Sequence, residues 1–390
     1  MVSSSRRELL KRAGAGALAV AAIGGGGVVW RLVQQSVLQP GAGEAYAAWD
    51  ADIAGGGTLS LVRAAVLAAN AHDTQPWFFD VTDRRIDLFA DRARNIGSLD
   101  PLHREMEVSL GCALENLVIT GRAIGLAPVV ALLPDRVDPD HIARIDLGAS
   151  TNATSPLFGA IPRRRTDRSA YSGRAVAPAV LAALSQMADD AKAQLVWLET
   201  DPAKSRFGEL TVQATTAIIA DPQQARDDFL WYRQDWVEIQ RERDGITLDA
   251  AGLAEPVRIA ARALPAEDRA ALQSGWLDAT RTRRVATAAA FGLVIVRDRL
   301  STPDRVSAGR LFQRVHLSAA TSDLAIQPLN QLIERADREL SAGLAPYFSD
   351  ALAGITPQGW AAVMAFRIGY PTSVPNRSPR RLAEQVIRAA

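Results

Sequence analysis

Two distant segments of this 390-residue chain resemble each other, and this similarity constrains the fold more than any other feature of the sequence. The nine residues GCALENLVI, which begin at Gly111, align with GRLFQRVHL, which begins at Gly309. Each segment follows a pattern typical of the start of a helix, a proline next to a capping residue. The pattern is Asp100-Pro101 in one case and Thr302-Pro303-Asp304 in the other. Such starts favour a first helical turn. The order predicts two diverged copies of one α+β unit.

The elements around these two helices follow the same order in both copies. In the first copy, apolar residues at helical spacing predict a helix over 59–71, and two short strands are predicted at 77–81 and 86–90. In the second copy, a helix is predicted at 178–188 and a strand at 194–199. The helix that contains Gly111 has an apolar stripe about 24 residues long, so we expect it to be central and buried.

A stretch with no counterpart in the first copy lies at 220–284 and is rich in arginine, aspartate and glutamine. A turn signal, Arg243-Asp244-Gly245, divides it into helical pieces. One interpretation is a solvated helical insertion with a few aromatic contacts. The other is a lid whose aromatic residues close over a ligand, because long insertions in compact domains are often functional. These aromatic residues are Trp231, Tyr232, Trp236 and Trp276.

The N-terminus has the pattern of a bacterial export signal. Residues 6–11, RRELLK, precede a stretch without charged residues over 13–30, which is typical of a signal for the twin-arginine export machinery. We expect export to the periplasm or the extracytoplasmic face, with residues 1–47 as signal and linker and a candidate cleavage motif at Ala45-Tyr46-Ala47. An uncleaved signal that tethers the protein to the membrane is the alternative, although the stretch is weakly apolar.

The composition excludes several classes of protein. The net charge of +1 provides no basic field for nucleic acid, and the single cysteine, Cys112, excludes an intramolecular disulfide framework. The four histidines are scattered, and no pair of histidine or cysteine residues has ligand spacing, so no metal site is expected. Neither a P-loop nor a G-x-S-x-G motif occurs.

Three polar segments are candidates for a binding site: AHDTQPW at 71–77, RRRTDR at 163–168 and RSPRR at 377–381. Two arginine clusters far apart in the sequence suit a phosphate monoester, because guanidinium groups bind phosphate oxygens in pairs. Solvated surface clusters are the alternative interpretation, since most arginine runs lie on the surface.

The order of the motifs resembles that of the FMN-binding nitroreductase-like superfamily. From the N-terminal side they read H-x-T-Q-P-W, D-P-x-x-R-E, G-x-A-L-x-N, R-R-T-x-R and S-P-R-R. The chain is most similar to the Acg-type branch, whose members are fused pseudo-dimers, and the match covers 59–386 apart from the insertion. The resemblance implies an α+β nitroreductase-like fold in two halves, 48–155 and 156–390, with the helical insertion in the second half.

The resemblance also implies one FMN per chain, held between the halves. The arginine loop belongs to the second half and the Q-P-W turn to the first, so one complete site can form, whereas the mirror-image site lacks both motifs. Asp73 stands where the family has asparagine, which replaces a two-donor amide by an acceptor. The implied assignments are Arg164, Thr166 and Arg168 at the phosphate and the flavin pyrimidine edge, Asn70, Ala71 and Asp73 along the flavin, Arg380 and Arg381 at the phosphate, and the segment from Gln327 to Asn330 as a backbone donor to the flavin N5.

The activity that the resemblance implies is electron transfer from NAD(P)H through FMN to a small nitro or quinone acceptor. The flavin N5 carries that chemistry, so no catalytic side chain is assigned. A non-catalytic protein that only holds FMN is the alternative, because a closed lid would keep nicotinamide away from the flavin. A third interpretation is a protein that keeps the fold and has lost the cofactor. Structural roles are predicted for His72, Cys112, Gly111 and Asn116.

Overall fold

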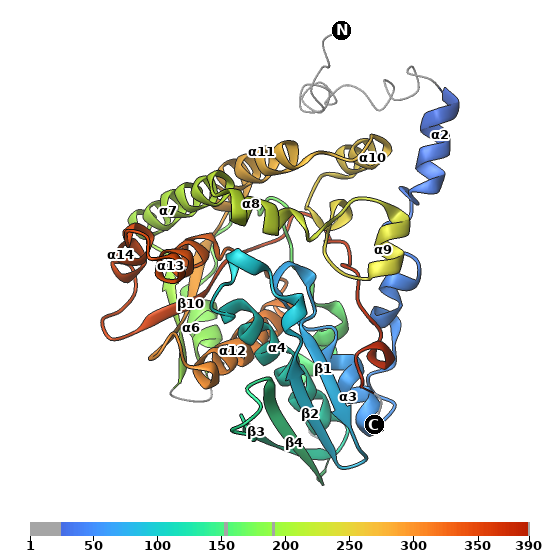
Figure 1. The fold of residues 1–390 in the computed structure, drawn as a ribbon, viewed down its shortest axis with the longest axis vertical. Coiled ribbons are helices and arrows are strands. Elements are labelled where there is room, and N and C mark those ends of the chain that lie inside the picture. Colours follow the sequence, from blue (N-terminus) through green and yellow to red (C-terminus); the bar gives the residue numbers. More distant parts are fainter. Residues whose placement is uncertain (1–24, 152–154, 189–191, 389–390) are drawn as a thin grey trace.

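The computed structural model describes residues 25–151, 155–188 and 192–388. They form two four-stranded antiparallel sheets, one from each half of the chain, and two long central helices that pack against each other and against the sheets (Figure 1). The twin-arginine motif and most of the uncharged stretch after it lie outside the described residues.

Both halves arrange their strands in the same way. The first half contains β1 (Trp77–Val81), β2 (Arg85–Ala90), β3 (Leu126–Leu132) and β4 (His141–Ala149), in the sheet order β1-β2-β4-β3. The second half contains β5 (Ala193–Leu198), β8 (Ala290–Val296), β9 (Ala325–Pro328) and β10 (Ala361–Gly369), in the order β5-β8-β10-β9. In each half a long helix, α4 (Arg104–Ala123) or α12 (Thr302–Thr321), joins the second strand to the third. The predicted α+β fold with two equivalent halves is therefore confirmed.

The helices that lead into these elements begin close to the predicted positions. α3 spans Gly57–Ala65 and α6 spans Pro178–Ser185, while a shorter helix, α5 (Pro156–Ala160), precedes the arginine loop. The predicted start of α4 at Asp100-Pro101 is wrong, because the helix begins one turn later, at Arg104. Asp100 still stabilises this end, since its carboxylate accepts hydrogen bonds from the backbone N–H groups of Glu105 (3.0 Å) and Met106 (2.9 Å).

The two central helices cross at a pair of glycines. A Cβ atom on Gly111 would lie 2.1 Å from the carbonyl oxygen of Val306, and one on Gly309 would lie 2.0 Å from that of Val108. Residues with a side chain cannot approach a neighbouring backbone this closely, so the predicted packing role of Gly111 is confirmed. The buried thiol of Cys112 donates a hydrogen bond to the carbonyl oxygen of Gly309 at the same crossing (3.2 Å).

The insertion occupies the whole connection between β5 and β8, whereas β1 and β2 of the first half are joined by a tight turn. It begins at Asp201 and so extends beyond the predicted 220–284. Its helices α7, α8, α11 and α10 lie across the top of the view in Figure 1. Its elements are α7 (Asp201–Ala220), α8 (Pro222–Phe229), β6 (Tyr232–Arg233), α9 (Trp236–Glu242), β7 (Ile246–Thr247), α10 (Glu255–Ala263), α11 (Arg269–Ala279) and a π-helical turn (Thr280–Val285); α13 (Gln331–Ala342) and α14 (Tyr347–Ala353) follow β9.

Residues 31–50, predicted to be mostly linker, are instead packed onto the fold. Arg262 of α10 donates a hydrogen bond to the backbone carbonyl oxygen of Gln35 (2.6 Å). Ala45 and Tyr46 of the candidate cleavage motif are buried in the core. This segment comprises the end of α2 (Gly25–Gln34) and a 3₁₀ helix (Glu44–Asp50). No helix in the described part of the chain has the length and apolar character needed to cross a membrane.

Candidate functional site

A cavity of about 820 Å³ is enclosed by both halves and by the insertion. A second cavity of about 30 Å³ adjoins it and shares part of its wall. The structure brings most of the sequence-predicted site residues to these two spaces. Asn70, Ala71, Thr166, Arg168, Gln327 and Asn330 line the large cavity, and Asp73, Arg164 and Arg380 line the small one.

Three arginines surround a tryptophan at the small cavity. The guanidinium carbons of Arg165 and Arg380 lie 3.9 and 5.1 Å from the centre of the Trp49 ring. Arg164 is 2% exposed and donates one hydrogen bond to the carbonyl oxygen of Leu67 (3.0 Å), while its Nε and Nη1 atoms have no partner. Burial, with the neighbouring Arg380 and Arg165, lowers the pKa of Arg164 to about 9. Buried cations in this arrangement favour binding of an anion.

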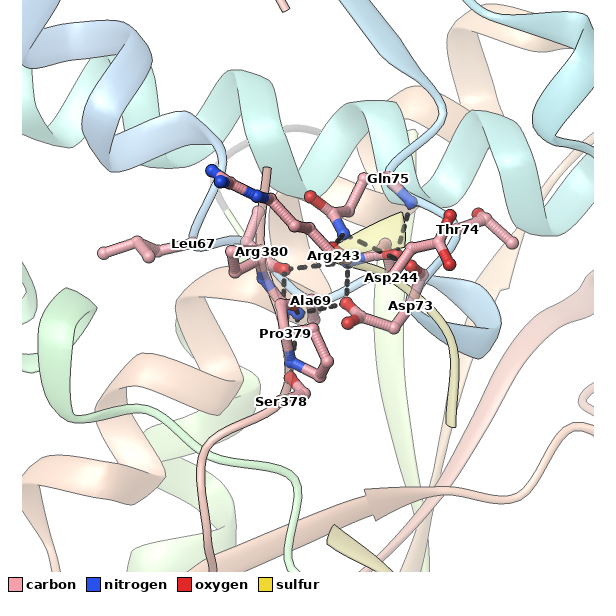
Figure 2. A network of polar contacts seen from close by, with 12 residues as sticks. Leu67, Ala69, Asp73, Thr74, Gln75, Arg243, Asp244, Ser378, Pro379 and Arg380 are labelled. Carbon is pink, nitrogen blue, oxygen red and sulfur yellow. Dashed lines mark hydrogen bonds and ion pairs between the residues drawn. The ribbon is translucent and has the colours of Figure 1, made fainter. Parts of the chain in front are cut away.

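The carboxylate of Asp73 lines the small cavity and faces one member of this cluster, Arg380 (Figure 2). It forms an ion pair with Arg380 and accepts a hydrogen bond from the Asn70 amide (3.3 Å), but its Oδ2 atom has no partner. Burial raises the pKa of Asp73 to about 7, although Arg380 acts in the opposite direction. The carboxyl group therefore takes up a proton near neutral pH, and it compensates the arginine charge fully only above that pH.

The turn that carries Asp73 depends on the insertion for support. His72, Asp73 and Gln75 have positive φ angles of 47°, 58° and 52°, a conformation that costs free energy in residues other than glycine. The Gln75 side chain donates a hydrogen bond to the carbonyl oxygen of Arg243 (2.8 Å). His72 Nε2 lies 2.9 Å from Oδ1 of Asp228. Because Arg243 and Asp228 both belong to the insertion, the insertion and the turn stabilise each other.

The arginine loop is fixed against β9. The backbone N–H of Asp167 donates to the carbonyl oxygen of Ile326 (3.2 Å), which continues the sheet by one bridge. Arg168 donates to the carbonyl oxygen of Ala250 in the insertion (3.2 Å) and lines both cavities. Burial lowers the pKa of Arg168. This loop therefore connects the anion-attracting small cavity with the large one.

The structure does not bring Arg381 to the cavities with the other predicted site residues. Arg381 lines neither cavity. Its guanidinium group donates to the backbone carbonyl oxygens of Gln75 and Trp77, and its backbone N–H donates to Oε1 of Gln75 (2.8 Å). The side chain next to Arg380 thus points to the start of β1, where it holds the C-terminal segment on the first half.

Two residues of the segment 327–330 cannot take the predicted role of backbone donor. Pro328 has no N–H group, and the N–H of Leu329 donates to the carbonyl oxygen of Ala365 (2.8 Å). The amide oxygen of Asn330 accepts a hydrogen bond from the N–H of Ala365 (2.9 Å). These groups fix the end of β9 to β10, so neither Pro328 nor Leu329 has an N–H available for a ligand.

Two carboxyl groups meet on the wall of the large cavity, Glu105 of α4 and Glu334 of α13. Burial and the neighbouring Glu105 raise the pKa of Glu334 well above its usual value. Arg104, which is fully buried, donates to Glu105 (3.1 Å) and to Asp337 (2.6 Å). Burial and the Glu105 carboxylate therefore both favour the protonated form of Glu334 at the cavity wall.

Several lining residues were missed from the sequence. Trp49 lies directly after the predicted linker, where a lone tryptophan beside glycine and alanine was the available signal. Phe312 and Met364 line the cavity from α12 and β10, where apolar residues at helix and strand spacing are expected to be core. Arg283 and Arg284 lie at the end of the insertion, in a run that looked like a solvated surface.

Comparison with known proteins yields relatives of one kind, although no protein-family model matches the chain. Rv3131 of Mycobacterium tuberculosis, named as a candidate NAD(P)H nitroreductase, is 32% identical over 174 residues, which cover 44% of this chain and 50% of the relative. The protein acg of the same organism, with the same description, is 32% identical over 112 residues, 28% of this chain and 34% of the relative. The chain thus spans half or less of the length of these curated relatives.

Two solved structures also align with the chain. The FMN-dependent nitroreductase NfnB from Mycobacterium smegmatis, in complex with NADPH, has a TM-score of 0.37 and 16% identity over 60% of this chain and 99% of NfnB. A nitroreductase with bound FMN from Desulfitobacterium hafniense has a TM-score of 0.35 and 13% identity over 61% of this chain and all of its own length (100%). The sequence relatives carry the assignment: the chain is similar to nitroreductase-like proteins and, within them, to homologues of the Rv3131 and acg type.

Proposed function

We propose that this protein binds one FMN between its two halves and acts as an NAD(P)H-dependent oxidoreductase of the nitroreductase-like class. The electron acceptor would be a small molecule of the nitro or quinone type. The proposal extends to this chain what the names of its relatives state for those proteins.

The observation that carries the proposal is the set of arginines at the small cavity, whose charge the single carboxylate of Asp73 compensates only in part. Arg164 has two buried nitrogen atoms without partners, and Arg380 has one. A phosphate group would supply acceptors for these donors and a counter-charge for the cluster. The adjoining cavity of about 820 Å³ has the size of a cofactor or ligand site. The residues present therefore fit a molecule with a phosphate at one end and a large ring system at the other.

Each part of the site has a role that follows from its chemistry. Arg164, Arg165 and Arg380 would hold the phosphate, and Thr166 and Arg168 would orient the molecule where the two cavities join. FMN, when bound, supplies hydride acceptance and electron transfer at its ring. The Glu334 carboxyl group, whose pKa burial and Glu105 raise, could offer a proton to a ligand in the large cavity.

The first test is the flavin content of the purified protein. We expect a yellow protein that releases about one FMN per chain on denaturation, because the small cavity and the large cavity adjoin and together form one site between the halves. Anaerobic addition of NADPH is then expected to bleach the flavin within the turnover time. A colourless protein with no flavin in the denatured supernatant would contradict the cofactor proposal, and an unbleached flavin would contradict the oxidoreductase proposal.

A non-catalytic FMN-holding protein is the second candidate, and the insertion is the observation that favours it. Many residues of the wall of the large cavity come from the insertion, including Tyr232 and Trp276. If the insertion stays closed, nicotinamide cannot reach the flavin ring. Retained flavin together with the absence of bleaching by either NADH or NADPH is the result expected from this alternative.

Asp73 makes phosphate binding depend on pH in a defined direction. The pKa of Asp73 is raised to about 7, and a bound phosphate would raise it further, so binding of FMN is accompanied by proton uptake. Affinity is therefore highest below pH 7 and falls by up to about tenfold for each pH unit above it. Asp73→Asn, which removes the charge, is expected to bind FMN more tightly at pH 8.5 and to lose this dependence.

The measurement is an FMN titration of flavin-free protein, followed by fluorescence quenching across that pH range. The phosphate of FMN itself titrates near pH 6, but it does so equally with both proteins, so the ratio of the two dissociation constants isolates Asp73. A ratio that does not change with pH would contradict the assignment of Asp73 to the phosphate site.

We also propose that the protein is exported in its folded state with the flavin already bound. Trp49 of the small cavity and residues 31–50 belong to the packed structure, which suits a chain that folds before it crosses the membrane. Substitution of Arg6 and Arg7 by lysine is expected to leave the flavoprotein in the cytoplasm of a bacterial host, detected by cell fractionation. Unchanged distribution between the fractions would contradict twin-arginine export.

A further inference from the structure

A second group of arginines lies in the large cavity, apart from the small cavity. The π-helical turn at the end of α11 carries Arg283 and Arg284 into the cavity wall. Such turns break the regular hydrogen-bond pattern of a helix and are frequent at functional sites. In the described part of the chain, neither guanidinium group forms a hydrogen bond or an ion pair, and the Nε atoms of both are buried without a partner.

The surroundings of Arg284 are positive. Arg168, Arg283 and Arg367 all lie near enough to lower its pKa, which burial in the first place brings to about 9. Tyr232 is the remaining neighbour that influences this group, and burial keeps its phenol neutral. The carboxylates of Asp278 and Asp167 act on Arg283 in the opposite direction. Buried guanidinium groups that outnumber the carboxylates beside them are costly unless an anion joins them.

This group is separate from the proposed phosphate site. Arg283 and Arg284 line the large cavity and not the small one, whereas Arg164 and Arg380 line the small cavity and not the large one. Arg168 is common to both walls. One phosphate in the small cavity therefore leaves the charge of Arg283 and Arg284 only partly compensated, by Asp278 and Asp167, so the cavity can accept a second anionic group.

We propose that Arg283 and Arg284 form a second anion site, which binds a phosphate or carboxylate group of the molecule that enters the cavity beside the proposed flavin. The inference rests on the proposed function and specifies its substrate class: the second ligand carries an oxyanion. Guanidinium groups recognise both kinds of oxyanion through paired N–H donors. Because the two arginines belong to the insertion, binding of that oxyanion also draws the insertion onto the ligand.

The test uses the double variant R283Q/R284Q and the control R281Q, which removes an exposed arginine from the same turn that lines neither cavity. Dissociation constants are measured by equilibrium titration of the oxidised flavoprotein with NADP⁺, which has the phosphates of NADPH but cannot reduce the flavin, with 4-nitrobenzoate and with neutral nitrobenzene. We expect the double variant R283Q/R284Q to bind at least one of the two anions about tenfold or more less tightly than the unmodified protein. Flavin content, nitrobenzene binding and the R281Q variant should match the unmodified protein.

The pattern identifies the source of the oxyanion. A loss confined to NADP⁺ assigns the site to a phosphate of the electron donor, and a loss confined to 4-nitrobenzoate assigns it to a carboxylate of the acceptor. A loss of both assigns it to either oxyanion. Unchanged affinity for both anions overturns the proposal, as does an equal loss for nitrobenzene, which would indicate a distorted cavity.

A protein without flavin would refute the proposed function and still allow the anion site to be tested. In that case calorimetric titration with inorganic pyrophosphate is expected to give one fewer bound anion for R283Q/R284Q than for R281Q. Equal numbers of bound pyrophosphate in the two variants would overturn the second site.

Discussion

Replacing Arg164 and Arg168 together by alanine is expected to yield a folded protein that retains no flavin. A hydrogen bond to a charged group contributes about 1.5–3 kcal/mol, so the loss of both side chains weakens phosphate binding by two to four orders of magnitude, given about 1.4 kcal/mol per tenfold change. In the flavin-free state Arg164 is a buried cation. Burial, together with Arg380 and Arg165, lowers its pKa to about 9. Its removal should therefore cost the flavin-free protein little stability.

The measurement is the FMN released on denaturation after gel filtration, with the melting temperature of each flavin-free protein as the test of folding. Cys112→Ser is the matched control, because this residue lines the large cavity but is uncharged, and burial raises the pKa of its thiol. The control should keep its flavin. Flavin retained by the double variant would place the phosphate elsewhere.

Substitution of Gly309 by alanine is expected to cause the largest loss of stability. The added methyl group would lie 2.0 Å from the carbonyl oxygen of Val108 and 2.9 Å from the Cα atom of Gly111. Both contacts are backbone atoms in the middle of α4, so they can move only if the whole helix moves. We expect the free energy of unfolding to fall by about 4 kcal/mol or more. Losses of this size arise from a few causes, among them severe overpacking.

Urea denaturation followed by circular dichroism measures this change, and Gly275→Ala is the matched control. Gly275 also lies within a helix, α11, but a Cβ atom there meets nothing within 4 Å. Alanine at this position should stabilise the protein by about 0.5–1 kcal/mol through helix propensity. Similar midpoints for the two variants would show that α4 and α12 are not in close contact.

Much of the fold follows from patterns within short segments. The strands predicted at 77–81 and 194–199 lie within one residue of β1 and β5, because alternating or continuous apolar runs between turns are local signals. The aligned glycines at 111 and 309 meet at the helix crossing, as the repeated order of elements in the two halves suggests. The order of the motifs likewise predicted that Asn70, Arg164 and Arg380 lie at one site, and the three residues line the same pair of cavities.

The features that could not be predicted depend on contacts between distant parts of the chain. The glycine- and alanine-rich segment 31–50 has few signals of its own, and it is held by residues such as Arg258, whose guanidinium donates to the carbonyl oxygen of Val37 (2.9 Å). Arg380 and Arg381 are adjacent and chemically alike, yet one enters the site and the other points to Gln75. Side-chain direction after a buried turn is set by packing, which sequence patterns do not encode.

The meeting of the two halves in a single polypeptide has a consequence for dilute solutions. A site assembled from separate subunits comes apart when the protein concentration falls below the dissociation constant of the dimer. Here the arginine loop and the turn at Asp73 are joined by a covalent chain, so their effective concentration does not depend on how many molecules are present. The site should therefore remain assembled at nanomolar protein concentrations, and each molecule should bind its ligand without a partner.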